Sequence, residues 1–176
     1  DILKNLPCSV SLTITTLDKQ ISKKIEPFAP MPDKRIDALK KLSKEGICCS
    51  IRLDPIIPGV NDKEIEKIIE TVSGFSEHVI ASTLKIRKNW LKNLTGVLPK
   101  CHFESLYFSE PNEVKNFFYI PKNFLEINNF FYLSDELRER LMVNVKEECD
   151  KYGLTFASCR EGFNYLNNAV CDGSQL

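Results

Sequence analysis

Strand-type and helix-type hydrophobic patterns alternate over the first half of this chain, and this alternation limits the possible folds strongly. Residues 9–16 alternate Ser and Thr with Val, Leu and Ile, which is the period of two expected of a strand. Residues 47–53 and 79–86 predict two further strands. Helical spacing of apolar residues predicts helices between them, over 32–45 and 61–73. Consecutive strands joined by helices run parallel, so an α/β protein with a parallel sheet is predicted.

The second half of the chain divides into two parts. Residues 88–133 are rich in Phe, Tyr, Asn and Lys and have weak periodicity. They predict a packed, irregular extension of the core or, alternatively, a surface on which nucleic-acid bases stack. Residues 134–152 predict a helix, and 154–159 predict a final strand. The predicted regions are therefore 1–87 with three strands, 88–133 as the extension, and 134–176 as a C-terminal helix, strand and tail.

Composition favours a folded protein of a reducing compartment. Hydrophobic residues make up 43% of the chain, enough for a packed core. The 24 basic and 24 acidic residues balance, which disfavours tight non-specific binding to nucleic acid. Seven cysteines occur without a Cys-x-x-Cys pair, and no apolar run approaches the ~20 residues that span a bilayer. A cytoplasmic protein without a membrane partner is expected.

Each predicted strand of the first half carries polar residues on one face, although a parallel strand buried on both faces is normally aliphatic throughout. These residues are Ser9, Ser11, Thr13 and Thr15, then Ser50, Arg52 and Asp54, then Thr83, Lys85 and Arg87. A closed apolar interior could not hold so many hydroxyl and charged groups without partners. Since α/β proteins bind ligands at the carboxyl ends of their strands, a polar pocket for a charged organic ligand is predicted there. The alternative is a solvated sheet face or a set of salt bridges among these residues, for example Arg52 with Asp54.

Two proline-rich motifs indicate that this chain resembles a known family. The first is Glu26-Pro27-Phe28-Ala29-Pro30-x-Pro32, and the second is Asp54-Pro-Ile-Ile-Pro-Gly-x-Asn-Asp62. Together they resemble radical S-adenosylmethionine (SAM) enzymes of the group related to spore photoproduct lyase. The resemblance spans residues 9–62 and continues in the tail at Ser158-Cys159-Arg-Glu-Gly-Phe163.

The resemblance implies a partial, TIM-like (β/α)6 barrel, of which this chain is the C-terminal portion, with strands four to six in residues 1–87. It also implies a [4Fe–4S] cluster held by a Cys-x-x-x-Cys-x-x-Cys loop, with SAM bound to the open iron. Reductive cleavage of SAM then yields a 5′-deoxyadenosyl radical that abstracts hydrogen from a substrate. This chain contains no such cysteine motif. The cluster ligands are therefore expected upstream of residue 1, and the chain alone is not expected to form the radical.

The resemblance also implies which residues bind the cofactor. Ser11 and Thr13 would line the SAM site, and Arg52 would pair with the SAM carboxylate or with a substrate anion. Pro58-Gly59 would let the backbone approach the adenosyl group closely. The predicted cofactor-binding residues are Ser11, Thr13, Arg52, Asp54, Pro58, Gly59 and Lys85.

Cysteines near the C-terminus offer a further candidate. Cys159 ends the last predicted strand and is the candidate catalytic residue, as a thiol that donates a hydrogen atom. Cys149, Cys159 and Cys171 could instead bind an auxiliary cluster, although their spacing matches no established iron–sulfur pattern. Cys149 lies on an apolar helix face, which favours burial.

The two motifs also have structural explanations. Asn61 and Asp62 are expected to cap the following helix rather than to contact a ligand. Glu26-Pro27 either orders a loop over the site or forms only a rigid turn.

Three functions are compatible with the sequence. The first is a fragment of a radical SAM enzyme, with nucleic acid as a possible substrate by family analogy alone. The second is a non-catalytic α/β ligand-binding or interaction module that uses the same pocket without a cluster. The third is a barrel enzyme with acid–base chemistry from Asp54, Lys85 and Glu26.

Overall fold

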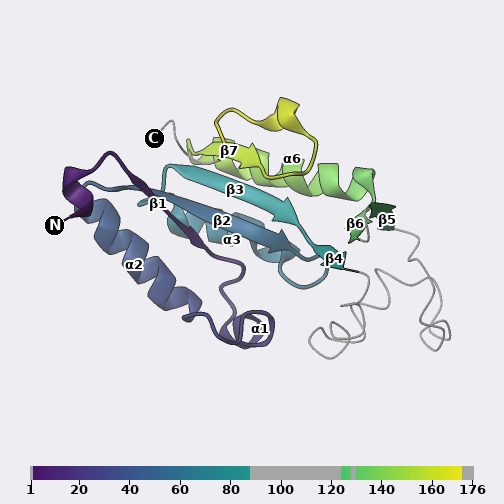
Figure 1. The fold of residues 1–176 in the computed structure, drawn as a ribbon, viewed down its shortest axis with the longest axis horizontal. Coiled ribbons are helices and arrows are strands. Elements are labelled where there is room, and N and C mark those ends of the chain that lie inside the picture. Colours follow the sequence, from purple (N-terminus) through teal and green to yellow (C-terminus); the bar gives the residue numbers. More distant parts are fainter. Residues whose placement is uncertain (1, 88–123, 128–129, 172–176) are drawn as a thin grey trace.

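The computed structural model describes residues 2–87, 124–127 and 130–171, so most of the predicted aromatic extension lies outside the described residues. A four-stranded parallel sheet in the order β1-β2-β3-β7 forms its centre (Figure 1). The strands are β1 (Ser9–Thr13), β2 (Cys48–Ile56), β3 (His78–Thr83) and β7 (Thr155–Ser158). A small antiparallel sheet in the order β4-β6-β5 comprises β4 (Lys85–Arg87), β5 (Phe124–Ile127) and β6 (Phe130–Leu133). The predicted α/β class with a parallel sheet is confirmed.

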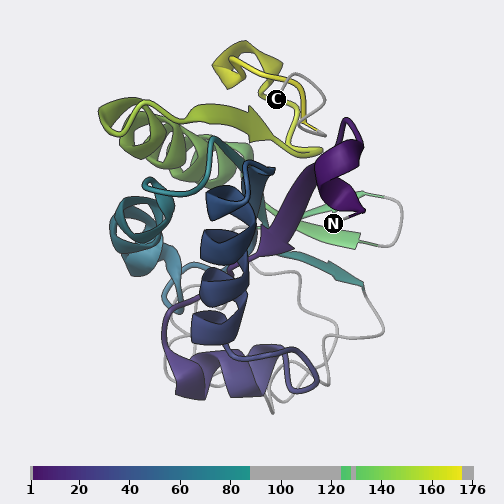
Figure 2. The same ribbon diagram turned by 90° about the vertical axis from the view of Figure 1, so that its left-hand side faces the viewer.

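Three helices cover one face of the parallel sheet (Figure 2). The described residues form the helices α1 (Lys19–Ile25), α2 (Pro32–Lys44), α3 (Ile65–Val72) and α6 (Asp135–Lys151). They also form the 3-10 turns η1 (Leu3–Asn5), η2 (Asp62–Glu64) and η5 (Asn164–Leu166). The covering helices are α2, α3 and α6, whereas α1 lies beyond the carboxyl end of β1. Pro32 begins α2 at a position where its missing N–H costs nothing, and Gly46, with φ +77°, follows its end. Within the described residues, no helix combines the length and the apolar character needed to cross a membrane.

The hydrophobic core lies between the sheet and these helices. Alternate residues of the strands point toward the helices, and the apolar stripe of each helix faces them. The fully buried members include Leu39, Ile51, Leu53, Ile68, Ile69, Val79, Val145 and Phe156. The opposite face of the sheet carries the polar residues on which the predicted site depends.

The strand register corrects the predicted phase of the third strand. Ser50 pairs with His78 and Arg52 pairs with Ile80, so His78 and Ile80 share the face of Arg52. Thr83, predicted on that face, instead pairs with Ile56 beyond an irregularity in the ladder. Lys85 and Arg87 belong to β4 in the second sheet. Periodicity within one strand cannot reveal an irregularity in the pairing of two strands.

The tail covers the free edge of β7 through side chains. Phe156 N donates to Asn168 Oδ1 at 2.6 Å, and Ser158 N donates to Asn167 Oδ1 at 2.7 Å. In the other direction, Asn168 N donates to Phe156 O at 3.1 Å. The two asparagines therefore satisfy backbone groups that a neighbouring strand would otherwise pair.

Candidate functional site

Arg52, Asp54 and Cys159 meet at the carboxyl end of the parallel sheet. Nη2 of Arg52 lies 3.3 Å from Oδ2 of Asp54 and 3.5 Å from Sγ of Cys159. Arg52 and Asp54 lie on β2, whereas Cys159 directly follows β7, with β3 between the two strands. The fold thus joins residues that are 107 positions apart in the sequence. It brings together two predicted cofactor-binding residues and the predicted catalytic cysteine.

Most N–H groups of the Arg52 guanidinium form no hydrogen bond with the described residues. Its side chain is 33% exposed, and only Nη2 donates hydrogen bonds to the described residues. Burial alone would lower the pKa of Arg52, but the contacts with Cys159 and Asp54 raise it above its ordinary value. A charged guanidinium with unused N–H groups matches a carboxylate or a phosphate.

Two hydroxyl-bearing residues of β1 lie on the same face as Arg52. Thr13 is its neighbour in the strand register, and Ser11 is the neighbour of Ser50. Ser11 is exposed and Thr13 is half-buried, and neither hydroxyl has a hydrogen-bond partner among the described residues. These hydroxyls and Arg52 form a continuous polar strip across two strands.

Lys85 is held by a buried carboxylate that the sequence analysis did not single out. Glu161 has a fully buried side chain, which accepts hydrogen bonds from Thr83 N at 2.9 Å and Thr83 Oγ1 at 3.1 Å. Lys85 Nζ lies 3.1 Å from Glu161 Oε1 and donates to Cys159 O at 3.3 Å. Lys85 therefore binds the backbone carbonyl of Cys159, and its charge is paired with a carboxylate of the protein itself.

Arg138 of α6 completes this buried group. Its Nη1 donates to Glu161 Oε2 at 3.0 Å and to Glu161 O at 2.9 Å, and its Nη2 pairs with Asp135. The guanidinium also lies 5.7 Å and 5.3 Å from the ring centres of Tyr132 and Phe163. Burial alone would lower the pKa of Arg138, but Asp135 and Glu161 raise it. The one sequence signal for this group is the charged pair Arg160-Glu161 shortly after the last strand.

The Glu26-Pro27 motif forms a rigid turn. Arg35 of α2 donates to both carboxylate oxygens of Glu26, at 3.1 Å and 2.8 Å, and Thr15 Oγ1 donates to Oε2 at 2.6 Å. Arg35 also donates to Thr13 O at 2.7 Å. Ala29 N closes the turn onto Glu26 O at 3.0 Å. Glu26, a candidate for acid–base chemistry, thus accepts hydrogen bonds from Thr15 and from Arg35.

The second motif fixes the loop after β2, and the predicted helix caps are wrong. Asn61 makes no capping hydrogen bond to η2. Its side chain is buried, accepts from Ile57 N at 2.6 Å and donates to Thr15 O at 2.8 Å and to Pro55 O at 3.0 Å. A buried amide that joins two loops satisfies more backbone groups than an exposed cap would.

Pro58 and Gly59 lie in the same loop. Pro58 is buried, and Gly59 has φ +75°, a conformation that residues with a Cβ rarely adopt. Gly59 N donates to Asp62 Oδ1 at 2.8 Å, so Asp62 also stabilises the loop and does not cap the helix. This turn accounts for the glycine without a ligand.

The three C-terminal cysteines are not brought together. Cys149 is fully buried on α6, where burial raises its pKa to about 12, whereas Cys159 and Cys171 are half-buried. Among the residues described, no group of three or more His, Cys, Asp or Glu side chains is placed to hold a metal ion. These side chains thus show no auxiliary cluster site.

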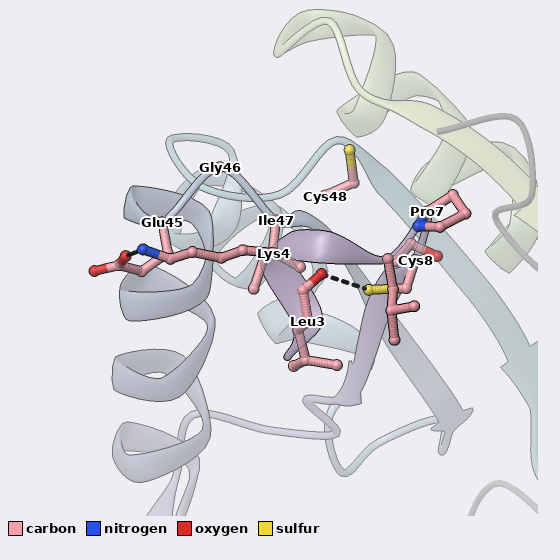
Figure 3. Close-up of a pocket in the computed structure, with 10 residues that line it drawn as sticks. Leu3, Lys4, Pro7, Cys8, Glu45, Gly46, Ile47 and Cys48 are labelled. Carbon is pink, nitrogen blue, oxygen red and sulfur yellow. Dashed lines mark hydrogen bonds and ion pairs between the residues drawn. The ribbon is translucent and has the colours of Figure 1, made fainter. Parts of the chain in front are cut away.

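A cavity of about 450 Å³ lies at the amino ends of β1 and β2, the opposite end of these strands from Asp54. Figure 3 shows its lining residues Leu3, Lys4, Pro7, Cys8, Glu45, Gly46, Ile47 and Cys48. Lys4 pairs with Glu45, and the Cys8 thiol lies 3.5 Å from Leu3 O. This cavity is therefore separate from the predicted site.

Comparisons with known proteins identify one partial relative. No family model and no solved structure matches the chain. Uncharacterized protein MJ0683 of Methanocaldococcus jannaschii is 38% identical over 78 residues, which are 44% of this chain. The match covers 29% of that protein, so the chain spans less than a third of the length of the relative. The chain is thus similar to part of a longer protein whose name states no activity.

Proposed function

We propose that this chain is part of a radical SAM enzyme and that its polar strip binds SAM. In this proposal, β1, β2 and β3 are strands four to six of a partial (β/α)6 barrel. The one-sided arrangement of α2, α3 and α6 supports it, because a barrel carries its helices on the outer face of the strands and its site at their carboxyl ends (Figure 2). The motifs in residues 9–62 support the same family.

The observation that carries the proposal is the unused donor capacity of Arg52 at the carboxyl end of the sheet. SAM carries a carboxylate, and a guanidinium binds a carboxylate through two parallel hydrogen bonds. Asp54 occupies one side of Arg52 and fixes its orientation. The free hydroxyls of Ser11 and Thr13 extend the strip along β1.

In this proposal, other residues would hold the site in place without binding SAM. Lys85 and Glu161 hold the backbone at Cys159, whose thiol lies beside Arg52 and is the proposed hydrogen-atom donor. The iron–sulfur cluster would supply the electron that cleaves SAM, with ligands from a part of the protein outside this chain. Cys8, Cys48, Cys49, Cys149 and Cys159 form no disulfide, which supports a reducing compartment such as the cytoplasm.

The test uses the complete protein, reconstituted with iron and sulfide in the absence of oxygen. Equilibrium dialysis against SAM compares the wild type with Arg52→Ala and with Arg140→Ala, an exposed arginine of α6. Loss of a charge-assisted interaction costs about 1.5–3 kcal/mol, so Arg52→Ala should weaken SAM binding roughly 10- to 100-fold. Arg140→Ala should bind SAM as the wild type does.

Two results would contradict the proposal at different points. Unchanged SAM affinity in folded Arg52→Ala would remove Arg52 from the site. Absence of both an iron–sulfur chromophore and 5′-deoxyadenosine after reduction with dithionite would exclude the enzyme. The alternative, a non-catalytic α/β ligand-binding module, would then be favoured.

A further inference from the structure

A fully exposed phenylalanine lies at the tip of the turn between α1 and α2. Phe28 is 100% exposed, and Pro27 and Pro30 beside it are also exposed. The turn follows α1, which lies beyond the carboxyl end of β1 and away from α6 (Figures 1 and 2). The chain thus presents an apolar tip at one end of the molecule.

The turn is rigid, so this exposure is built into the fold. Glu26, at its start, is held by Nη1 and Nη2 of Arg35 and by Thr15. Ala29 N closes the turn by donating to Glu26 O at 3.0 Å. Pro32, at the start of α2, is buried. An aromatic side chain on such a turn loses little conformational entropy on binding a partner.

Three lysines that form no ion pair with the described residues flank the tip. Lys23 and Lys24 lie in the last turn of α1, and Lys34 lies in the first turn of α2. All three are exposed, and none forms an ion pair with a carboxylate of the described residues. Lys19, by contrast, pairs with Asp33 at 2.9 Å. The tip therefore combines an apolar centre with a positively charged rim.

We propose that this tip, formed by Pro27, Phe28 and Pro30 with Lys23, Lys24 and Lys34, docks a partner protein whose apolar pocket has an acidic rim. Aromatic residues in pockets dominate the energetics of protein interfaces, and rim charges accelerate association. The inference goes beyond the proposed function, because it requires neither SAM nor a cluster.

A polypeptide fits the tip better than a nucleic acid does. Proteins that bind single strands present a basic groove with several aromatic rings along it. Here one ring stands at a protruding turn among proline rings, which offer apolar contact and no hydrogen-bond donor. A pocket that receives Phe28, with carboxylates around it, would match both the shape and the charge.

The experiment measures binding of the complete protein to a random copolymer of glutamate and tyrosine, with polyglutamate as a probe of charge alone. Fluorescence anisotropy follows the labelled polymers at low salt. Phe28→Ala should weaken copolymer binding at least about 5-fold and leave polyglutamate binding unchanged. The double variant Lys23→Glu/Lys24→Glu should weaken binding of both polymers.

Matched variants control for charge and folding. Lys41→Glu/Lys44→Glu changes two exposed lysines in the last turn of α2 and should bind both polymers as the wild type does. Equal weakening by this pair, or wild-type copolymer binding by folded Phe28→Ala, would overturn the proposal. So would tighter binding of an oligothymidylate that is lost in Phe28→Ala, because the tip would then be a nucleic-acid surface.

Discussion

Cys149 on α6 shows how burial sets the chemistry of a single side chain. The thiol is fully buried, and burial raises its pKa from the ordinary 9.0 to about 12. The folded state therefore holds this proton more tightly than the unfolded state does. Its contribution to stability is complete below the unfolded pKa and is lost as the pH rises from about 9 toward about 12. Burial of Cys149 was predicted from the apolar face of the helix and is confirmed.

We expect the free energy of unfolding to fall by about 1.4 kcal/mol more in the wild type than in Cys149→Ala between about pH 7 and about pH 10. The reason is that unfolding releases the Cys149 proton in the wild type only. Urea titrations at both pH values provide the measurement. Val145→Ala, on the same buried face of α6, should retain the wild-type difference, and an equal difference in Cys149→Ala would contradict the prediction.

At the scale of elements, Asn61 joins the loops that follow β1 and β2. Its amide reaches Thr15 O after β1, Pro55 O near the end of β2 and Ile57 N directly after β2. Glu64 adds a second link, because its carboxylate accepts from Thr16 Oγ1 at 2.6 Å and from Leu17 N at 2.8 Å. The motifs that carry the family resemblance therefore hold the loops at the carboxyl end of the sheet.

Replacing Asn61 by Ala should lower the free energy of unfolding by about 2–4 kcal/mol, because it leaves buried backbone groups without partners. Asp62→Ala removes one bond of a less buried residue and should cost about 1 kcal/mol. Urea unfolding measures both. If Asn61→Ala were as stable as the wild type but bound SAM more weakly, the asparagine would be a ligand contact and its structural role would be wrong.

The elements were largely predictable, and the contacts between their loops were not. Period-two and helical spacing located the strands of the parallel sheet and the helices α2, α3 and α6, because each pattern reflects one buried face. The short helix α1 was missed, since its Lys-rich sequence buries only Ser22. Thr15 and Asn61 are 46 positions apart, and no local pattern reports such a contact. Arg52 and Asp54 were found because charge on a buried-strand pattern is itself anomalous.

At the scale of the whole molecule, Glu161 connects parts that are distant in the sequence. It binds Thr83 at the end of β3, Lys85 of β4 and Arg138 of α6, and it lies in the tail next to Cys159. The hydrogen bonds and ion pairs of Glu161 thereby join the site to the C-terminal region. Sequence reasoning missed Glu161, because a glutamate after a strand is ordinarily exposed.

We expect Glu161→Gln to lower the free energy of unfolding by about 3–5 kcal/mol, since it leaves Lys85 and Arg138 without their buried carboxylate. Asp150→Asn is the matched control, because it breaks the Lys146–Asp150 pair on the surface of α6 and should cost less than about 1 kcal/mol. Urea unfolding compares the two. Equal losses would show that the buried group contributes no more than a surface pair.

The asparagines that cover β7 have a consequence for assembly. Because Asn167 and Asn168 bind Phe156 N, Phe156 O and Ser158 N, this edge of the sheet is largely closed to a further strand. The other border, along β1, has no strand beside it among the described residues. We therefore expect a further strand, from the same polypeptide or from another molecule, to join the sheet at β1.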